Sequence, residues 1–302
     1  MTRHRTHLDP FAMALIALLC ALWGAQQVAI KLAAPDISLV MQAALRSLGA
    51  TLLLLIWMRL RGQTLFERDS SLGPGLLAGL LFGIEFLLIY LGLSYTTASR
   101  SIIFIYTAPF VVALGAHLFL PAEKLRLLQV IGLISAFAGI LTAFADGLSL
   151  GSPDMLKGDA LALMGAILWG ATTILIKASC LARIPPAKTL FYQLVVSAPL
   201  LLTASLLMGE PGVMNLSLVA VSSLLFQTVI VAFASYLAWF WLIAHYPASR
   251  LSAFTFLTPL FGLAFGGIIL NEPITPLLIL ALGFVTAGIW LVNRPARKQD
   301  AC

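Results

Sequence analysis

Two tryptophan–glycine pairs lie in apolar surroundings at corresponding places in the two halves of the chain. Trp23-Gly24-Ala25 is followed by Lys31, eight residues after the tryptophan, and Trp169-Gly170-Ala171 is followed by Lys177 at the same spacing. An indole inside an apolar helix can stack on a substrate or fill space between helices, and its N–H needs a partner either way. Glycine lets another helix or a ligand approach the backbone closely. The pattern therefore indicates either a pair of aromatic walls beside a substrate or tight helix packing.

Charged residues also occur within or at the ends of apolar segments, where a charge is costly. The planar guanidinium of Arg46 could clamp a carboxylate or form a structural salt bridge. Glu85 is the carboxylate placed well inside a segment, and three interpretations stay open: a proton-linked or amine-binding group, a buried partner for Arg46 or Lys31, or a group solvated near an interface. Lys31 and Lys177 end their segments. We expect them to snorkel to the interface, with contact to a substrate carboxylate as the alternative.

Polar and aromatic residues inside these segments are expected to face a cavity or one another. Gln193 is one such candidate among several glutamines and threonines. The predicted substrate-binding residues are Trp23, Gln27, Arg46, Glu85, Tyr90, Tyr106, Trp169, Tyr236 and Trp239.

Two prolines lie inside long apolar segments at matching places, Pro109 and Pro259. Proline removes a backbone donor and kinks a helix. Because the two positions correspond, we expect gating hinges; incidental kinks are the alternative.

The elements that carry these residues are expected to cross a membrane. Of the 302 residues, 61% are hydrophobic and 10% are charged, and the mean hydropathy is +1.01. A soluble domain has about 25% charged residues, and about 20 apolar residues cross the ~30 Å hydrocarbon core. The fold class is therefore an all-α membrane protein. Breaks at Gly, Pro and charged residues give ten predicted spans, at 11–31, 39–58, 73–93, 98–119, 126–145, 158–179, 188–208, 217–243, 248–270 and 274–293.

The basic residues between these spans predict an orientation. Most of the 18 Lys and Arg residues fall at one side of the membrane, whereas Lys31, Arg100 and Lys157 fall at the other. Because the basic side is normally cytoplasmic, we expect a multi-pass plasma (inner) membrane protein with both termini in the cytoplasm.

Ordered sequence matches predict an internal repeat. Ala98-Ser99-Arg100 returns as Ala248-Ser249-Arg250, and Pro109 returns as Pro259, both 150 residues later. Self-similarity at half the chain length indicates two similar halves. Five helices per half place the halves in opposite orientations, so a central cavity is expected between two inverted repeats. The predicted repeats are residues 11–145 and 158–293.

These motifs resemble those of the EamA-type transporters in the drug/metabolite transporter superfamily. The paired Trp-Gly motifs, the Ala-Ser-Arg segments followed by proline, and the glutamates in Pro121-Ala122-Glu123 and Asn271-Glu272-Pro273 carry the resemblance, which spans about residues 11–293. It implies a ten-helix inverted-repeat fold that exports small metabolites. More specifically, the chain resembles the bacterial amino-acid exporters of that family, including the aromatic amino-acid type.

The sequence shows no nucleotide-binding, hydrolase or zinc-protease motif, so we expect no enzyme activity, cofactor or metal. Asp146, Asp154 and Asp159 are interpreted as loop or helix-capping residues. We expect a secondary transporter that exports amino acids, aromatic or hydrophobic ones included, or similar small metabolites by alternating access. A drug carrier or a nucleotide-sugar or phosphorylated-metabolite carrier is the alternative. A proton gradient or facilitated diffusion would each suffice to drive export.

Overall fold

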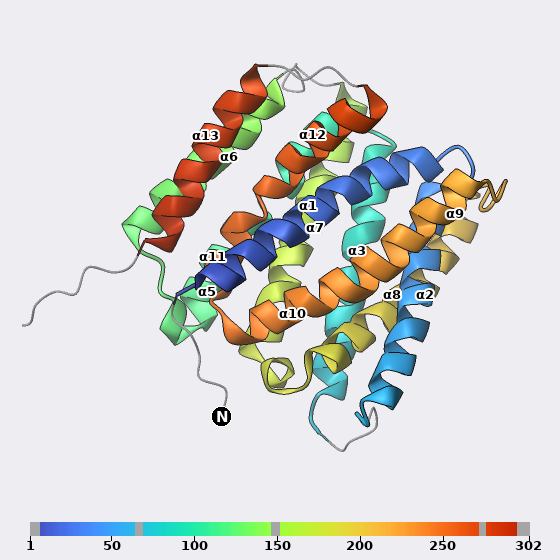
Figure 1. Ribbon diagram of the computed structural model, residues 1–302, viewed down its shortest axis with the longest axis horizontal. Helices are drawn as coiled ribbons and strands as arrows, with labels where there is room; N and C mark the ends of the chain where they lie inside the picture. Colours follow the sequence, from blue (N-terminus) through green and yellow to red (C-terminus); the bar gives the residue numbers. More distant parts are fainter. Residues whose placement is uncertain (1–6, 64–68, 146–151, 272–275, 295–302) are drawn as a thin grey trace, which may run out of the picture.

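The computed structural model describes residues 7–63, 69–145, 152–271 and 276–294, and its regular elements are helices. Over these residues, eight helical stretches are long and apolar enough to cross a membrane, and two more apolar helices have 17 residues each. Eight of the predicted spans overlap the longer stretches, and the predicted spans 126–145 and 274–293 overlap the two shorter helices. In chain order (Figure 1), the elements are α1 (Pro10–Ala33), α2 (Leu39–Leu60), α3 (Leu72–Leu93), α4 (Ala98–Ile105), α5 (Ala108–Phe119), η1 (Pro121–Glu123), α6 (Leu127–Ala143), α7 (Pro153–Ala178), η3 (Cys180–Arg183), α8 (Pro186–Leu207), α9 (Leu218–Leu225), η4 (Phe226–Ser235), α10 (Tyr236–His245), α11 (Ala248–Phe254), α12 (Leu257–Leu270) and α13 (Leu277–Asn293).

Two of the predicted spans are interrupted just before their prolines. The span with Pro109 divides into α4 and α5, and the span with Pro259 divides into α11 and α12. A proline ring displaces the carbonyl four residues earlier and donates no hydrogen bond. A threonine hydroxyl also binds a backbone carbonyl at each break: Thr107 Oγ1 donates to the Phe104 carbonyl at 2.7 Å and Thr255 Oγ1 to the Ser252 carbonyl at 2.6 Å.

A third predicted span contains a π-helical segment that the sequence analysis did not foresee. The segment η4 joins α9 to α10 without a loop. Wide turns of this kind are rare and often occur at functional sites. The last residue of η4, Ser235, is buried and faces the side chain of Trp23, as described below.

The helices pack in a few close pairs. Helix α2 packs on α8, α3 packs on both α7 and α8, α1 packs on α12, and α5 packs on α7. The two 17-residue helices, α6 and α13, lie side by side at one edge of the bundle (Figure 1).

Glycines bring α6 and α13 close together. A Cβ added at Gly132 would lie 2.7 Å from the Gly288 carbonyl oxygen, and a Cβ added at Gly288 would overlap the Gly132 carbonyl oxygen. Backbone approach through small residues is a main source of helix association in lipid, where no hydrophobic effect drives helices together.

We therefore expect Gly288→Ala to destabilise the protein by about 1–3 kcal/mol, the usual cost of overpacking a tight contact. Thermal unfolding in detergent would measure the loss. Gly283→Ala on the same helix is the matched control, because an added Cβ there meets nothing within 4 Å. Equal melting temperatures for the two variants would contradict this account of the α6–α13 contact.

We name the two ends of the bundle by the short helices that begin there. The α4 end is where α3 ends and α4 and α7 begin; the α11 end is where α10 ends and α1 and α11 begin. Hydrogen bonds fix both groupings: Arg100 of α4 binds Asp159 of α7, and Tyr246 after α10 donates to Asp9 before α1 at 2.9 Å.

Candidate functional site

A central cavity of about 560 Å³ lies between the helices of the bundle. Its lining comes from α1, α2, α3, α4, α7, α8, α10 and α12, together with Tyr106 at the α4–α5 break. The volume falls within the range of small-molecule sites, which are mostly apolar with a few convergent polar groups. The wall of this cavity follows that description, because aromatic and aliphatic side chains surround a small number of charged and amide groups.

The structure brings the predicted substrate-binding residues together. All nine line this cavity, although they come from five helices and one helix break. Their role in binding stays a prediction. The nine are Trp23, Gln27, Arg46, Glu85, Tyr90, Tyr106, Trp169, Tyr236 and Trp239.

The first tryptophan–glycine pair combines both interpretations made from the sequence. The Trp23 indole lines the cavity, donates its N–H to Ser235 Oγ at 2.9 Å and lies edge-on to Trp239, with ring centroids 5.5 Å apart. Gly24 packs against α12 instead, because an added Cβ would lie 2.7 Å from the backbone nitrogen of Gly262. The tryptophan thus forms the cavity wall while the glycine permits close helix packing.

The second pair repeats this arrangement. The Trp169 ring lines the cavity and lies edge-on to Tyr106, with centroids 6.1 Å apart. Gly170 faces α5, where an added Cβ would lie 2.5 Å from the Val111 side chain. Each indole is therefore held by a helix contact at the next residue, which fixes the position of the wall.

The two buried charges in the cavity are not paired with each other. Arg46 is 1% exposed, and its guanidinium lies over the Phe86 ring, 4.4 Å from the centroid. Its Nε and Nη2 atoms are buried without a hydrogen-bond partner. Glu85 is also buried, and within the described part of the chain it forms no hydrogen bond or salt bridge with Arg46 or Lys31. Glu85 and Arg46 do interact electrostatically without direct contact, so the roles of Glu85 as a buried partner and as an amine-binding group both stay predictions.

Other buried polar atoms on the cavity wall also lack partners. Both amide atoms of Gln193 are unpaired, as are the hydroxyl oxygens of Ser101 and Thr258. Most buried polar groups in proteins are hydrogen-bonded, so each exception calls for an explanation. A polar ligand in the cavity would satisfy them.

The two ends of the cavity differ in access. At the α4 end, the lining includes the exposed residues Lys31 and Ala98. At the α11 end, residues 248–254 of α11 are all buried, and so are Thr255 and Phe256 at the following break. The cavity therefore opens at the α4 end and is closed at the α11 end.

Lys177 contributes to the closed end, and the expectation that it snorkels to the interface is wrong. Its side chain is buried and donates to the carbonyls of Ile243 at 2.6 Å and Tyr246 at 2.5 Å. A cation is favourable there, because the last carbonyls of a helix carry partial negative charge. Glu123 lies 3.9 Å from the same ammonium and accepts 3.2 Å hydrogen bonds from the backbone and hydroxyl of Ser249. We call these five residues the α11-end cluster.

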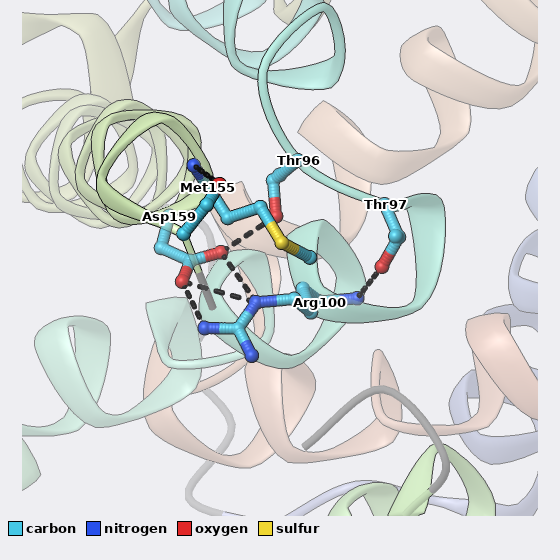
Figure 2. A network of polar contacts seen from close by, with 6 residues as sticks. Thr96, Thr97, Arg100, Met155 and Asp159 are labelled. Atoms are coloured by element: carbon cyan, nitrogen blue, oxygen red, sulfur yellow. Dashed lines mark hydrogen bonds and ion pairs between the residues drawn. The ribbon is translucent and has the colours of Figure 1, made fainter. Parts of the chain in front are cut away.

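The prediction for Asp159 is also wrong. It was expected to be a loop or helix-capping residue, but its side chain is buried, with the residue 4% exposed, and it forms a salt bridge with Arg100. Figure 2 shows the Arg100 guanidinium reaching the Asp159 carboxylate from α4, with Thr96 on the same carboxylate. Arg100 Nε lies 3.2 Å from both oxygens, Nη2 contacts Oδ2, and Thr96 Oγ1 donates to Oδ1 at 2.8 Å. Asp154 forms an exposed pair with Lys157, and Asp146 lies outside the described residues.

Sequence reasoning missed two phenylalanines that complete the aromatic wall. Phe82 and Phe86 line the cavity beside Tyr90, and the Phe82 and Phe86 ring centroids lie 4.9 Å apart. The three rings are spaced four residues apart, which places them on one face of α3. The four-residue spacing of these aromatic residues, on the same predicted helix as Glu85, could have identified Phe82 and Phe86 as cavity residues.

Comparison with known sequences identifies the family. Residues 10–145 and residues 156–294 each match the EamA-like transporter family, and together they cover most of the chain. The chain belongs to the EamA-like transporter family.

Several known proteins resemble the chain over nearly its whole length. The uncharacterized transporter YvbV of Bacillus subtilis is 29% identical over 95% of this chain and 93% of its own. A protein of Escherichia coli named as a probable amino-acid metabolite efflux pump is 25% identical over 92% of this chain and 93% of its own. A solved crystal structure shares the fold, with a TM-score of 0.81 at 17% identity, over 97% of this chain and 100% of the other. This EamA-like protein is therefore a multi-pass membrane transporter and not an enzyme.

Proposed function

We propose that this transporter exports amino acids or similar small metabolites by alternating access, with aromatic and hydrophobic amino acids among its substrates. The observation that carries the proposal is the aromatic-lined cavity, in which two atoms of the Arg46 guanidinium have no hydrogen-bond partner and no salt bridge joins Arg46 to Glu85 within the described residues. An amino acid offers the complementary carboxylate, ammonium and side chain. The relatives named as probable amino-acid metabolite efflux pumps support the same substrate class.

A ten-helix fold of two inverted repeats accounts for the two ends of the cavity. The break before Pro109 and the break before Pro259 occupy matching places in residues 11–145 and 158–293. The first break produces the short helix α4 at one end of the bundle, and the second produces the short helix α11 at the other end. In our proposal the two short helices are alternating gates, with the prolines as hinges. Here α11 closes its end while α4 leaves its end open. Exchange of these two conformations between the halves moves the opening across the membrane.

The proposed direction follows from the orientation. With both termini in the cytoplasm, the α11 end faces the cytoplasm and the α4 end faces outward, so the structure is open to the outside. The plasma (inner) membrane is the proposed location. The proposed binding partners are the lipid bilayer and a small-molecule substrate. Protons are a further partner if a proton gradient drives transport.

The carrier of drugs, nucleotide sugars or phosphorylated metabolites remains the second candidate. A phosphate-bearing substrate would favour several cations in the cavity, since a phosphoryl group carries more negative charge than a carboxylate. The basic side chains on the wall are those of Arg46 and Lys31, and Lys31 lies at the open end. The balance of one central cation and one central carboxylate fits a zwitterion better.

Replacing either Trp23 or Trp169 with alanine should lower transport of phenylalanine in proteoliposomes by about tenfold. The reason is loss of an aromatic contact together with its buried area, which is worth at least ~1.4 kcal/mol. Trp290→Ala is the control, because Trp290 is 59% exposed on α13, away from the cavity. Wild-type transport rates in both cavity variants, with expression unchanged, would show that the indoles only pack helices.

A further inference from the structure

Unsatisfied polar atoms from the neighbouring helices α2 and α8 line the same cavity. Arg46 of α2 is 1% exposed and Gln193 of α8 is 0% exposed, and both line the cavity. Four of their side-chain nitrogen and oxygen atoms have no hydrogen-bond partner: Nε and Nη2 of Arg46, and Nε2 and Oε1 of Gln193. A buried polar group that makes no hydrogen bond lowers the stability of the folded protein. Two such side chains on neighbouring helices indicate a ligand site.

The unpaired atoms of Arg46 form one edge of the guanidinium. Nε and Nη2 point in parallel and can hold both oxygens of one carboxylate. Arg100 shows this use within the same molecule, because its Nε and Nη2 bind the Asp159 carboxylate (Figure 2). On Arg46 the same two atoms are free of partners while the flat face rests on Phe86. The edge is thus held in position for a carboxylate that the protein does not supply.

Among the described residues, Glu85 is the carboxylate whose charge acts on Arg46, and it does not bind the unpaired edge of the guanidinium. Arg46 interacts electrostatically with Glu85, Tyr90 and Tyr236. Within the described residues, however, no salt bridge joins Arg46 to Glu85. Two opposite charges therefore lie in one buried neighbourhood without direct contact, which suits a ligand that bridges them.

The charges also break the similarity of the two halves. At the offsets of 146 to 150 residues that relate the repeated motifs, Arg46 corresponds to a position within residues 192–196 and Glu85 to one within residues 231–235. Neither stretch contains a charged residue. Only the first half thus supplies charge, and a one-sided pair can bind the asymmetric head group of an amino acid in a single orientation.

We propose that Arg46 and Gln193 form the carboxylate subsite of this transporter and that Glu85 binds the ammonium group of the same substrate. This proposal rests on the proposed function and makes it more specific: the substrate is a zwitterionic α-amino acid with both head groups free. Gln193 Nε2 donates to the carboxylate, and the side chain of the substrate packs against the aromatic wall. Amines that lack the carboxylate and acids that lack the amine are rejected.

The test is competition against labelled phenylalanine uptake in proteoliposomes. Unlabelled phenylalanine, phenethylamine and 3-phenylpropionate share the ring and differ in the head groups. We expect phenylalanine to compete at least about tenfold better than either analogue, the factor for one charged hydrogen bond of about 1.4 kcal/mol or more. Arg46→Lys and Gln193→Leu should each raise the half-saturating phenylalanine concentration about 10- to 100-fold for the same reason.

The pattern of competition separates binding from a structural role. Arg46→Lys and Gln193→Leu should narrow the preference for phenylalanine over phenethylamine, whereas Glu85→Gln should narrow the preference over 3-phenylpropionate. Lys157→Gln is the charge-loss control, because Lys157 is exposed on α7 and absent from the cavity wall. Variants that only misfold would lose uptake without changing these ratios, and unchanged ratios in all three would overturn the subsite.

Failure of the subsite and failure of the transport function give different results. If wild-type protein carries phenylalanine and phenethylamine equally well, the subsite is wrong and the proposed function stands. If wild-type protein carries no amino acid at all, the proposed function is wrong and the subsite falls with it.

Discussion

Replacing Asp159 with alanine should destabilise the protein by about 3–5 kcal/mol, because it removes the carboxylate that binds the buried Arg100 guanidinium. The Asp159 carboxylate holds Arg100 and Thr96 at the α4 end, and the two partners of the salt bridge have side chains only 10% and 5% exposed. Unfolding in detergent, followed by thermal or denaturant titration, would measure the loss.

Two variants sharpen this test. Asp154→Ala lies on the same helix and removes the same charge, but its pair with Lys157 is 69% and 66% exposed, so its effect should stay below about 1 kcal/mol. The double variant Arg100→Met with Asp159→Leu should recover much of the loss, since no charge is then left unpaired. Equal stability of the Asp154 and Asp159 variants would contradict the assigned role.

Lys177→Met should open the α11 end. The substitution removes both hydrogen bonds to the carbonyls at the end of α10 and leaves Glu123 without its nearby cation. Hydrogen bonds to charged groups contribute about 1.5–3 kcal/mol each, so the closed conformation should lose at least a factor of about ten in population.

Cys20 provides a native reporter for this opening. Its thiol is 0% exposed and donates to the Phe254 carbonyl of α11 at 3.3 Å, so it becomes accessible when α11 moves away. In a background without Cys180 and Cys302, a thiol reagent should label Cys20 at least about ten times faster in Lys177→Met than in wild type. Lys31→Met is the control at the open end and should leave Cys20 protected. Slow labelling of Cys20 in Lys177→Met would show that Lys177 does not hold the α11 end closed.

The cavity residues could be predicted because their chemistry conflicts with lipid. Arg46 and Glu85 are costly in hydrocarbon, so a cavity was the expected place for both. Trp23 and Trp169 drew attention through their repeated setting, and both line that cavity. The positions of the helices along the chain followed from apolar runs of about 20 residues separated by Gly, Pro and charged residues.

Residues with remote partners could not be placed from the sequence. Lys177 ends its helix as a snorkelling lysine would, and only the fold brings it to carbonyls 66 and 69 residues later. Asp159 lies at the start of the predicted span 158–179, as a capping residue would, but α7 begins at Pro153 and the partner of Asp159 is 59 residues earlier. The π-helical segment η4 likewise has no local marker, because wide turns depend on packing against neighbouring helices.

The most direct measurement is flux of labelled amino acids into proteoliposomes that contain the purified protein, with and without an imposed pH gradient. Our account predicts saturable phenylalanine uptake that excess unlabelled substrate abolishes. Uptake that follows the pH gradient and loses this dependence in Glu85→Gln would assign proton coupling, whereas uptake indifferent to the gradient would assign facilitated diffusion. Absence of amino-acid flux in both conditions, while a phosphorylated metabolite or a drug is carried, would contradict the proposed function.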